Sequence, residues 1–206
     1  MAKQAVDVNY DVIGFPIRPG IYINNKVRLL SIEAFSKALE PSRLNILKLV
    51  AFGLTKPSQI MAKLRIPKST FYRHLNILIK YGWLEKINGD LKFSAPIYLT
   101  FTVLSNGKGI KVIIKSNHGA FIDERMGLII INSIKPIRNC SLCPMLSRCT
   151  AYVKALARDF NIRLSSESPA EAYIEILSTI ASRRLPKALS TGYLDLPSFT
   201  LNSING

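Results

Sequence analysis

The stretch from Pro67 to Lys86, PKSTFYRHLNILIKYGWLEK, most limits what this chain can fold into. Its apolar residues recur at i, i+4, i+7 and i+8, which is the stripe of a helix packed on a core. Gly82 is a natural stop for that helix. Ser69 and Thr70 lie near its start, where hydroxyls of this kind cap free backbone N–H groups. The apolar stripe consists of Phe71, Leu75, Leu78 and Ile79.

We expect three shorter helices before this stretch and a β-hairpin after it. Apolar periodicity predicts the helices over residues 31–40, 42–53 and 57–64. Asn88-Gly89 lies between two short apolar runs and is a strong signal for a hairpin turn. The order of helices followed by a hairpin predicts a winged helix-turn-helix, so we expect an α+β fold.

The chain is basic, most of all around this helix-turn-helix. It has 206 residues, with 28 Lys and Arg against 13 Asp and Glu and a net charge of +15. Residues 41–92 contain ten of the cations and two of the acids, a local net charge of +8. An imbalance of this size favours a polyanionic partner, and we expect double-stranded DNA. A membrane surface fits less well, because no amphipathic Lys-rich helix with a Trp or Phe face is present.

Two sequence motifs support a DNA-binding function. Residues 38–43 match an Ala-Leu-x3-Arg start, and residues 69–82 match a Ser-x3-Arg-His-Leu-x2-Leu-x3-Gly core. On these motifs, residues 35–86 resemble the winged helix-turn-helix of the ArsR-like transcription regulators, of an archaeal type. The resemblance implies a non-enzymatic DNA-binding regulator. Tyr72 stands where that family usually has a small Ser, and the metal-sensing Cys pair of arsenic-responsive members is absent from residues 57–70.

The free side of the long helix is the expected DNA-reading surface. Such a helix enters the major groove and reads base edges, while flanking cations hold phosphates. Arg73 can donate to guanine, and Asn76 can pair with adenine. Lys86 and Lys92 flank the wing tip, within reach of the phosphate backbone. The expected DNA-binding residues are Lys68, Ser69, Thr70, Tyr72, Arg73, Asn76, Lys86 and Lys92.

The remaining sequence suggests four further segments around the winged helix. No catalytic constellation occurs in them, so we expect no enzymatic activity. The apolar breadth of residues 168–184 suits burial within the monomer or against a second copy, and residues 31–40 are a second candidate for a dimer surface. We expect a β-hairpin arm at 1–30 turning at Asn24-Asn25, the winged helix at 31–94, a small antiparallel β region at 95–139, a cysteine motif with C-terminal helices at 140–184, and a tail at 185–206.

All three cysteines fall in one run, Cys140, Cys143 and Cys149, with the spacing C-x2-C-P-x4-C. Closely spaced thiolates in a cytoplasmic protein more often mean a metal than a disulfide. Pro directly after a Cys is frequent in iron–sulfur ligand runs. We expect an iron–sulfur cluster, with zinc as the second choice, for which His118 can supply a fourth ligand. Reduced thiols without a metal and a disulfide are the alternatives left open.

We therefore expect a cytoplasmic, sequence-preferring transcription regulator that responds to redox state or metal. A homodimer would place two reading helices about 34 Å apart on one face of the duplex. The chain shows no secretory signal and no apolar run of the ~18–20 residues that a membrane span needs. The alternative is a component of the transcription or replication machinery that docks on RNA polymerase or another transcription protein, similar to the beta subunit of archaeal transcription factor E.

Overall fold

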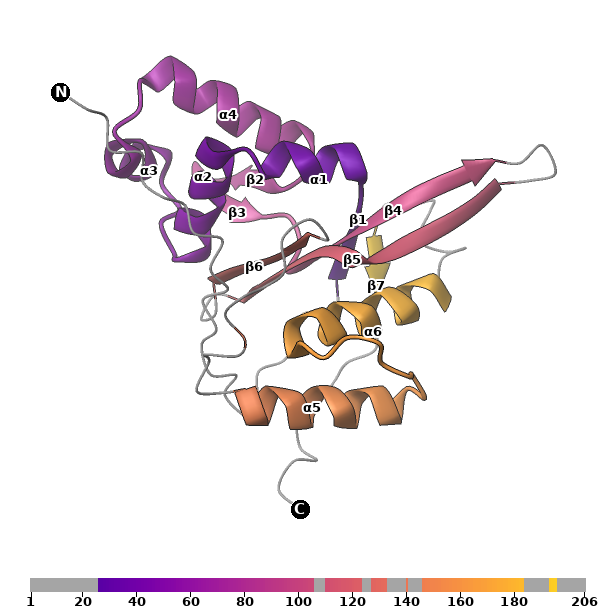
Figure 1. Cartoon of the computed structure of the whole chain (residues 1–206). Helices are drawn as coiled ribbons and strands as arrows, with labels where there is room; N and C mark the ends of the chain where they lie inside the picture. The colour runs from indigo at the N-terminus through magenta and orange to yellow at the C-terminus, as the bar shows by residue number, and fades with distance from the viewer. Residues whose placement is uncertain are drawn as a thin grey trace.

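The computed structural model describes residues 26–105, 110–123, 127–132, 140, 146–183 and 193–195 (Figure 1). The fold is α+β, with a winged helix-turn-helix followed by strands and C-terminal helices, as the sequence predicts. Along the described chain the elements are β1 (Lys26–Ser31), α1 (Ile32–Ala38), α2 (Pro41–Ala51), α3 (Pro57–Leu64), α4 (Lys68–Lys80), β2 (Leu84–Ile87), β3 (Asp90–Phe93), β4 (Ile97–Ser105), β5 (Ile110–Asp123), β6 (Gly127–Asn132), α5 (Leu146–Asp159), α6 (Pro169–Arg183) and β7 (Tyr193–Asp195).

Local sequence signals explain where the winged helix begins and turns. The Ser31 side chain accepts a hydrogen bond from the Ala34 N–H at 3.1 Å, so α1 starts directly after β1. In the wing, Ile87 pairs with Asp90 across a two-residue turn. Asn88 and Gly89 both have positive φ, 51° and 89°, as this kind of tight hairpin turn requires.

Two expected helix caps do not form. α4 begins at Lys68, and its N-cap residue is Pro67, which makes no side-chain cap hydrogen bond. Ser69 therefore lies inside the first turn rather than at the cap position that its hydroxyl was predicted to fill. Ser168 and Glu171 have the spacing that predicts a capping box around Pro169, and α6 does begin at Pro169, but the Ser168 hydroxyl is buried without a hydrogen-bond partner, so no capping box forms.

In the sequence, the winged helix lies between two strands, β1 and β4, that are neighbours in one sheet. The strand order is β6-β5-β4-β1-β7, in which β1 runs parallel to β4 and the other pairs are antiparallel. Parallel neighbours need a long crossover connection, and here everything from α1 to β3 forms that crossover. The sequence placed residues 26–30 in an N-terminal hairpin arm, whereas the structure uses them as a strand of the central sheet. The predicted turn at Asn24-Asn25 lies outside the described residues.

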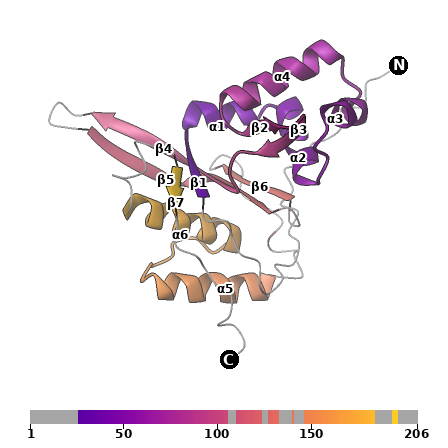
Figure 2. The ribbon, with the colours of Figure 1, turned by 180° about the vertical axis from the view of Figure 1, so that it is seen from behind.

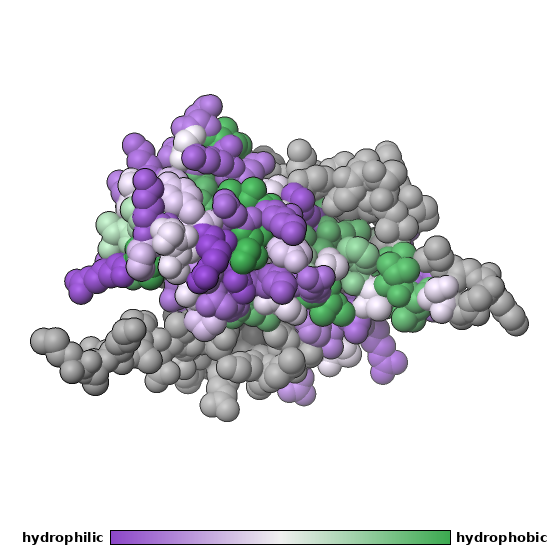
Figure 3. All heavy atoms as spheres, turned by 90° about the horizontal axis from the view of Figure 1, so that it is seen from above, coloured by the Kyte–Doolittle hydropathy of each residue, from purple (hydrophilic) through white to green (hydrophobic). Residues whose placement is uncertain are grey.

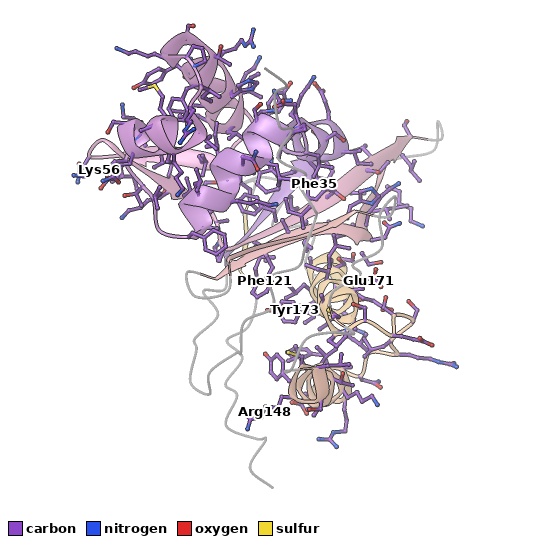
Figure 4. The ribbon with its side chains drawn as sticks, turned by 60° about the vertical axis from the view of Figure 1, so that its left-hand side comes forward. Phe35, Lys56, Phe121, Arg148, Glu171 and Tyr173 are labelled. Carbon is purple, nitrogen blue, oxygen red and sulfur yellow. The ribbon has the colours of Figure 1, made fainter. Side chains whose placement is uncertain are left out.

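The two faces of this sheet bury two separate cores. Side chains alternate along each strand, so β1 sends Leu30 toward the winged helix and Val27 toward α6. Phe35 of α1 lies on one side of the sheet, and Phe121 meets Tyr173 of α6 on the other, with ring centroids 5.4 Å apart (Figure 4). Seen from behind, α5 packs beneath α6, so the layers run winged helix, sheet, α6 and α5 (Figure 2).

The apolar breadth of α6 is used within the chain. Tyr173, Ile174 and Leu177 are buried in the core that α6 forms with β5 and α5. Gly119 of β5 permits this close approach, because a Cβ there would lie 2.9 Å from Ile174 Cγ2. α1 likewise buries Phe35 in the winged-helix core. In both helices, the apolar face that the sequence suggested for a dimer is therefore covered within the chain. No described helix combines the length and the apolar character needed to cross a membrane.

Tyr98 links the winged helix to the sheet. Its hydroxyl donates to the Trp83 carbonyl at 2.8 Å and accepts from the Ala95 N–H at 2.9 Å. The Tyr98 and Trp83 rings are stacked, with centroids 4.6 Å apart. Burial raises the pKa of Tyr98 to about 12, although hydrogen bonds from Ser94 and Ala95 act in the opposite direction. The hydroxyl therefore stays protonated and keeps its role as a donor.

Replacing Tyr98 with Phe tests this link. The Tyr98→Phe variant leaves the buried Ala95 N–H without its partner and removes one of the two hydrogen bonds to the Trp83 carbonyl, which keeps the Ser94 N–H, so we expect the free energy of unfolding to fall by about 1–3 kcal/mol. The matched control is Tyr81→Phe, which removes a hydroxyl bonded to Glu33 at the exposed surface and should change stability by about 0.5 kcal/mol or less. Urea denaturation measures both, and equal losses in the two variants would show that the link is unimportant.

Candidate nucleic-acid interface

One side of α4 is a continuous polar row. Exposed residues occur at i, i+3, i+4, i+7 and i+11, which is the spacing of a single helix face. The opposite side is buried in the winged-helix core through Phe71, Leu75 and Leu78. The row therefore points away from the protein along the whole helix. It consists of Ser69, Tyr72, Arg73, Asn76 and Lys80.

The six predicted DNA-binding residues of α4 differ in their exposure and in their place relative to the polar row. Lys68 is exposed at the first helical residue, beside the row. Thr70 is half-buried on its flank, and Tyr72 is 36 % exposed with its ring edge-on to Phe71 at 5.3 Å. Packing of this kind holds the Tyr72 ring at the surface while its edge stays accessible. Arg73 and Asn76 are exposed near the middle of the row.

The two predicted wing lysines are exposed but face different sides of the hairpin. Lys86 lies opposite Leu91, which is buried, and Lys92 lies opposite Glu85. Directly opposed residues share one face of an antiparallel pair, so Lys86 and Lys92 are on opposite faces. The carboxylate of Glu85 is the cross-strand neighbour of Lys92. The wing therefore does not present both cations to one line of phosphates.

Three further exposed cations lie beside this surface. They contributed to the local charge of residues 41–92, but the sequence did not predict them as DNA-binding residues. Lys56, Lys63 and Arg65 are exposed around α3, and Lys56 extends outward from the body (Figure 4). The Leu91 N–H donates to the Thr55 carbonyl at 2.8 Å, so the wing is fastened beside Lys56. Viewed from above, hydrophilic side chains cover much of the winged helix (Figure 3). The helix-turn-helix order around α3 was the signal that could have placed these cations.

A polar cluster ties the start of α2 to α4. Glu40 is the N-cap of α2, and its carboxylate accepts hydrogen bonds from the Ser42 and Arg43 N–H groups at 3.2 and 3.1 Å. His74 Nδ1 lies 3.4 Å from Glu40 Oε2, although the buried ring makes no hydrogen bond through this atom. Arg73 of the polar row directly precedes His74 in α4, so this cluster lies directly behind the row.

Burial and charge shift both titratable groups of this cluster in the same direction. Burial lowers the pKa of His74; the Glu40 carboxylate acts against this, and Arg43 and Arg73 lower the pKa further. For Glu40, burial would raise the pKa, but the hydrogen bonds from Ser42 and Arg43, with the charges of His74 and Arg43, bring it below its ordinary value. A neutral His74 beside an ionised Glu40 is therefore the state at neutral pH.

Two of the predicted metal ligands, His118 and Cys149, lie on different parts of the fold. Cys140 and Cys149 are half-buried, and Cys143 is outside the described residues. The His118 ring meets Phe35 at 6.2 Å on the winged-helix face of the sheet, whereas Cys149 belongs to α5 on the other face. Within the described residues, no three His, Cys, Asp or Glu side chains are grouped to hold a metal ion. The structure thus does not bring His118 beside Cys149, and the cluster stays a prediction.

Acidification should weaken the fold through His74. Its folded pKa lies below that of the unfolded chain, so the unfolded state takes up the proton first and stability falls as pH drops below about 6.5. We expect the melting temperature to decline from pH 7.5 to 5.5, with a smaller decline in His74→Gln. The pKa of His118 is also lowered, by burial and Lys115, so His118→Gln measures the other histidine's share. A His74→Gln slope equal to that of the unmodified protein would contradict the assignment.

Comparison with known proteins agrees with this geometry. Residues 40–86 match the family model described as "Bacterial regulatory protein, arsR family". The matched segment runs from the N-cap of α2 through α4 to Lys86 in the wing. No curated protein matches the chain. The match supports a DNA-binding transcription regulator. The segment from residue 40 to residue 86 is an ArsR-like winged helix-turn-helix.

Proposed function

We propose that this chain is a transcription regulator that binds double-stranded DNA with sequence preference by placing α4 in the major groove. The observation that carries the proposal is the exposed polar row of α4 within an ArsR-like domain. Its side chains combine a guanidinium, an amide and hydroxyls, which are the groups that read base edges. No reaction is part of this function, since it needs only binding and positioning.

Base reading and phosphate binding fall to different residues. Arg73 and Asn76 lie near the middle of the row, where a helix seated in the groove is closest to the bases. Lys56, Lys63 and Arg65 lie outside α4 and suit phosphate contacts that hold the helix in register. Lys86 suits such a contact better than Lys92, because Lys92 has Glu85 as its cross-strand neighbour.

Two classes of variant separate these roles. With a duplex selected from a random pool, Arg73→Ala should lose about 1–3 kcal/mol of binding free energy for the selected sequence and little for unrelated sequences. Lys56→Ala should weaken all sequences alike and reduce the salt dependence by about one phosphate contact. Lys154→Ala, on the exposed side of α5 beyond the sheet, is the matched charge control and should change neither.

Fluorescence anisotropy over a range of salt concentrations measures all three variants. The proposal fails if the protein shows no duplex affinity at low salt, or if Arg73→Ala affects every sequence equally. Weak, sequence-blind binding together with co-purification of RNA polymerase would favour the docking alternative instead.

We also propose that the regulator acts as a homodimer on a two-fold symmetric site. A single recognition helix covers only a few base pairs, so two helices on one duplex raise both affinity and specificity. With the apolar faces of α1 and α6 covered inside the chain, the dimer needs a different surface from those that the sequence suggested.

The metal or redox response rests on the cysteine spacing alone. Protein purified without oxygen should be brown and contain iron if Cys140, Cys143 and Cys149 hold an iron–sulfur cluster. One zinc per chain in colourless protein would indicate a structural zinc site instead. The Cys149→Ser variant should lose the metal in either case, whereas Ser147→Ala, which changes a position between two of the cysteines without removing a thiol, should keep it. Protein that contains neither metal would remove the redox hypothesis.

A further inference from the structure

Tyr72 contributes the aromatic ring of the exposed row on α4. The other members of the row are Ser69, Arg73, Asn76 and Lys80, all polar or charged. Tyr72 is 36 % exposed, whereas Phe71, directly before it, is fully buried in the winged-helix core. The two neighbouring aromatic residues therefore have different surroundings: Phe71 packs inside the domain, and part of the Tyr72 ring stays available to a ligand.

The ring of Tyr72 is held in place by its packing. It meets the Phe71 ring at a centroid distance of 5.3 Å and an interplanar angle of 78°. Phe71 is fixed by the core, so the Tyr72 ring has a rigid support next to it on the same helix. A ring that is ordered before binding loses little conformational entropy when it meets a ligand. This order favours a specific contact at this position.

Tyr72 lies in the part of α4 that is expected to meet the bases. It is the fifth residue of a helix that runs from Lys68 to Lys80, and the N-terminal residues of a recognition helix contact base edges. Ser69 lies three residues before it and Asn76 four residues after it, so both flank the ring on one helix face. The ring is thus an apolar contact set among hydrogen-bonding groups.

The major groove offers one apolar group to such a ring. Base edges present hydrogen-bond donors and acceptors there, and thymine adds its 5-methyl group. The phosphate backbone suits cations instead, and the exposed Lys68 and Arg73 lie beside the ring for such contacts. A ring packed on a methyl group removes both apolar surfaces from water, which is favourable. The thymine methyl is therefore the base group that matches Tyr72 best.

We propose that Tyr72 is a specificity-determining residue that reads the 5-methyl group of a thymine in the bound duplex. This inference rests on the proposed function, because it requires α4 to enter the major groove, and it adds the base that the ring selects. Four residues of an α-helix span about 6 Å, close to the rise of about two base pairs. The thymine should therefore lie within about two base pairs of the position that Asn76 contacts.

Replacing thymine with uracil tests the proposal, because uracil lacks the methyl group and keeps every hydrogen-bonding group of the base. The full chain is titrated by fluorescence anisotropy with the duplex selected from a random pool, carrying uracil at one thymine position at a time. We expect at least one position at which uracil weakens binding about fourfold, the worth of one buried methyl group. Tyr72→Ala should bind the thymine and uracil duplexes equally, whereas Tyr72→Phe, which keeps the ring, should keep the difference.

Phe52→Ala is the matched control. Phe52 is an aromatic residue of the winged helix that is 49 % exposed and lies outside α4, at the C-cap of α2. Its removal should leave the ratio of thymine to uracil affinity as it is in the unmodified protein. Circular dichroism shows whether each variant folds. Tyr72→Gln, which also lacks the ring but keeps a long side chain over Phe71, is measured in parallel and should lose the difference as Tyr72→Ala does.

Three results would overturn the proposal. They are uracil without effect at every position, a thymine preference that folded Tyr72→Ala or Tyr72→Gln retains, and a preference that Tyr72→Phe loses. The last result would assign the reading to the hydroxyl instead of the ring. In all three the protein still binds the selected duplex, so the proposed function stands. A protein without duplex affinity at low salt would remove both.

Discussion

The parallel pairing of β1 with β4 is the constraint on which the rest of this structure depends. Two parallel neighbours cannot be joined by a tight turn, so the connection must leave the sheet and return to its starting end. In this chain the connection is the whole reading domain, from α1 to the wing. Both ends of that domain are therefore held by adjacent strands, and those strands are buried from the other side by α6. The orientation of α4 relative to the sheet follows from this arrangement.

Two contacts join the end of α4 to the sheet. Gly82, with φ of 75°, ends the helix and lies against the guanidinium of Arg28 on β1, which a side chain at this position would displace. The next residue, Trp83, stacks on Tyr98 of β4 and accepts its hydroxyl hydrogen bond. Thus both central strands reach the same turn.

The sequence predicts the parts of this fold that local chemistry specifies. Periodicity gives the helices within one or two residues, and Asn88-Gly89 gives the wing turn, because these signals act over a few neighbouring residues. The role of β1 was missed, since its partner is about seventy residues away and no local pattern records a parallel pairing. The burial of α6 was predicted, but the sequence left open whether this chain or a second copy covers its apolar face. In the structure this chain covers it, and Gly119 leaves the room that Ile174 needs. Similarly, Lys56 and Arg65 contributed to the charge count, while only the folded arrangement places them beside α4.

The same arrangement places two helical parts of different charge on opposite faces of the sheet. The winged helix carries the local excess of +8, whereas residues 146–183 beneath the sheet contain five cations and four acids. The sheet separates these two parts, so of the two the more positive lies on the side of α4, which favours the approach of a duplex from that side.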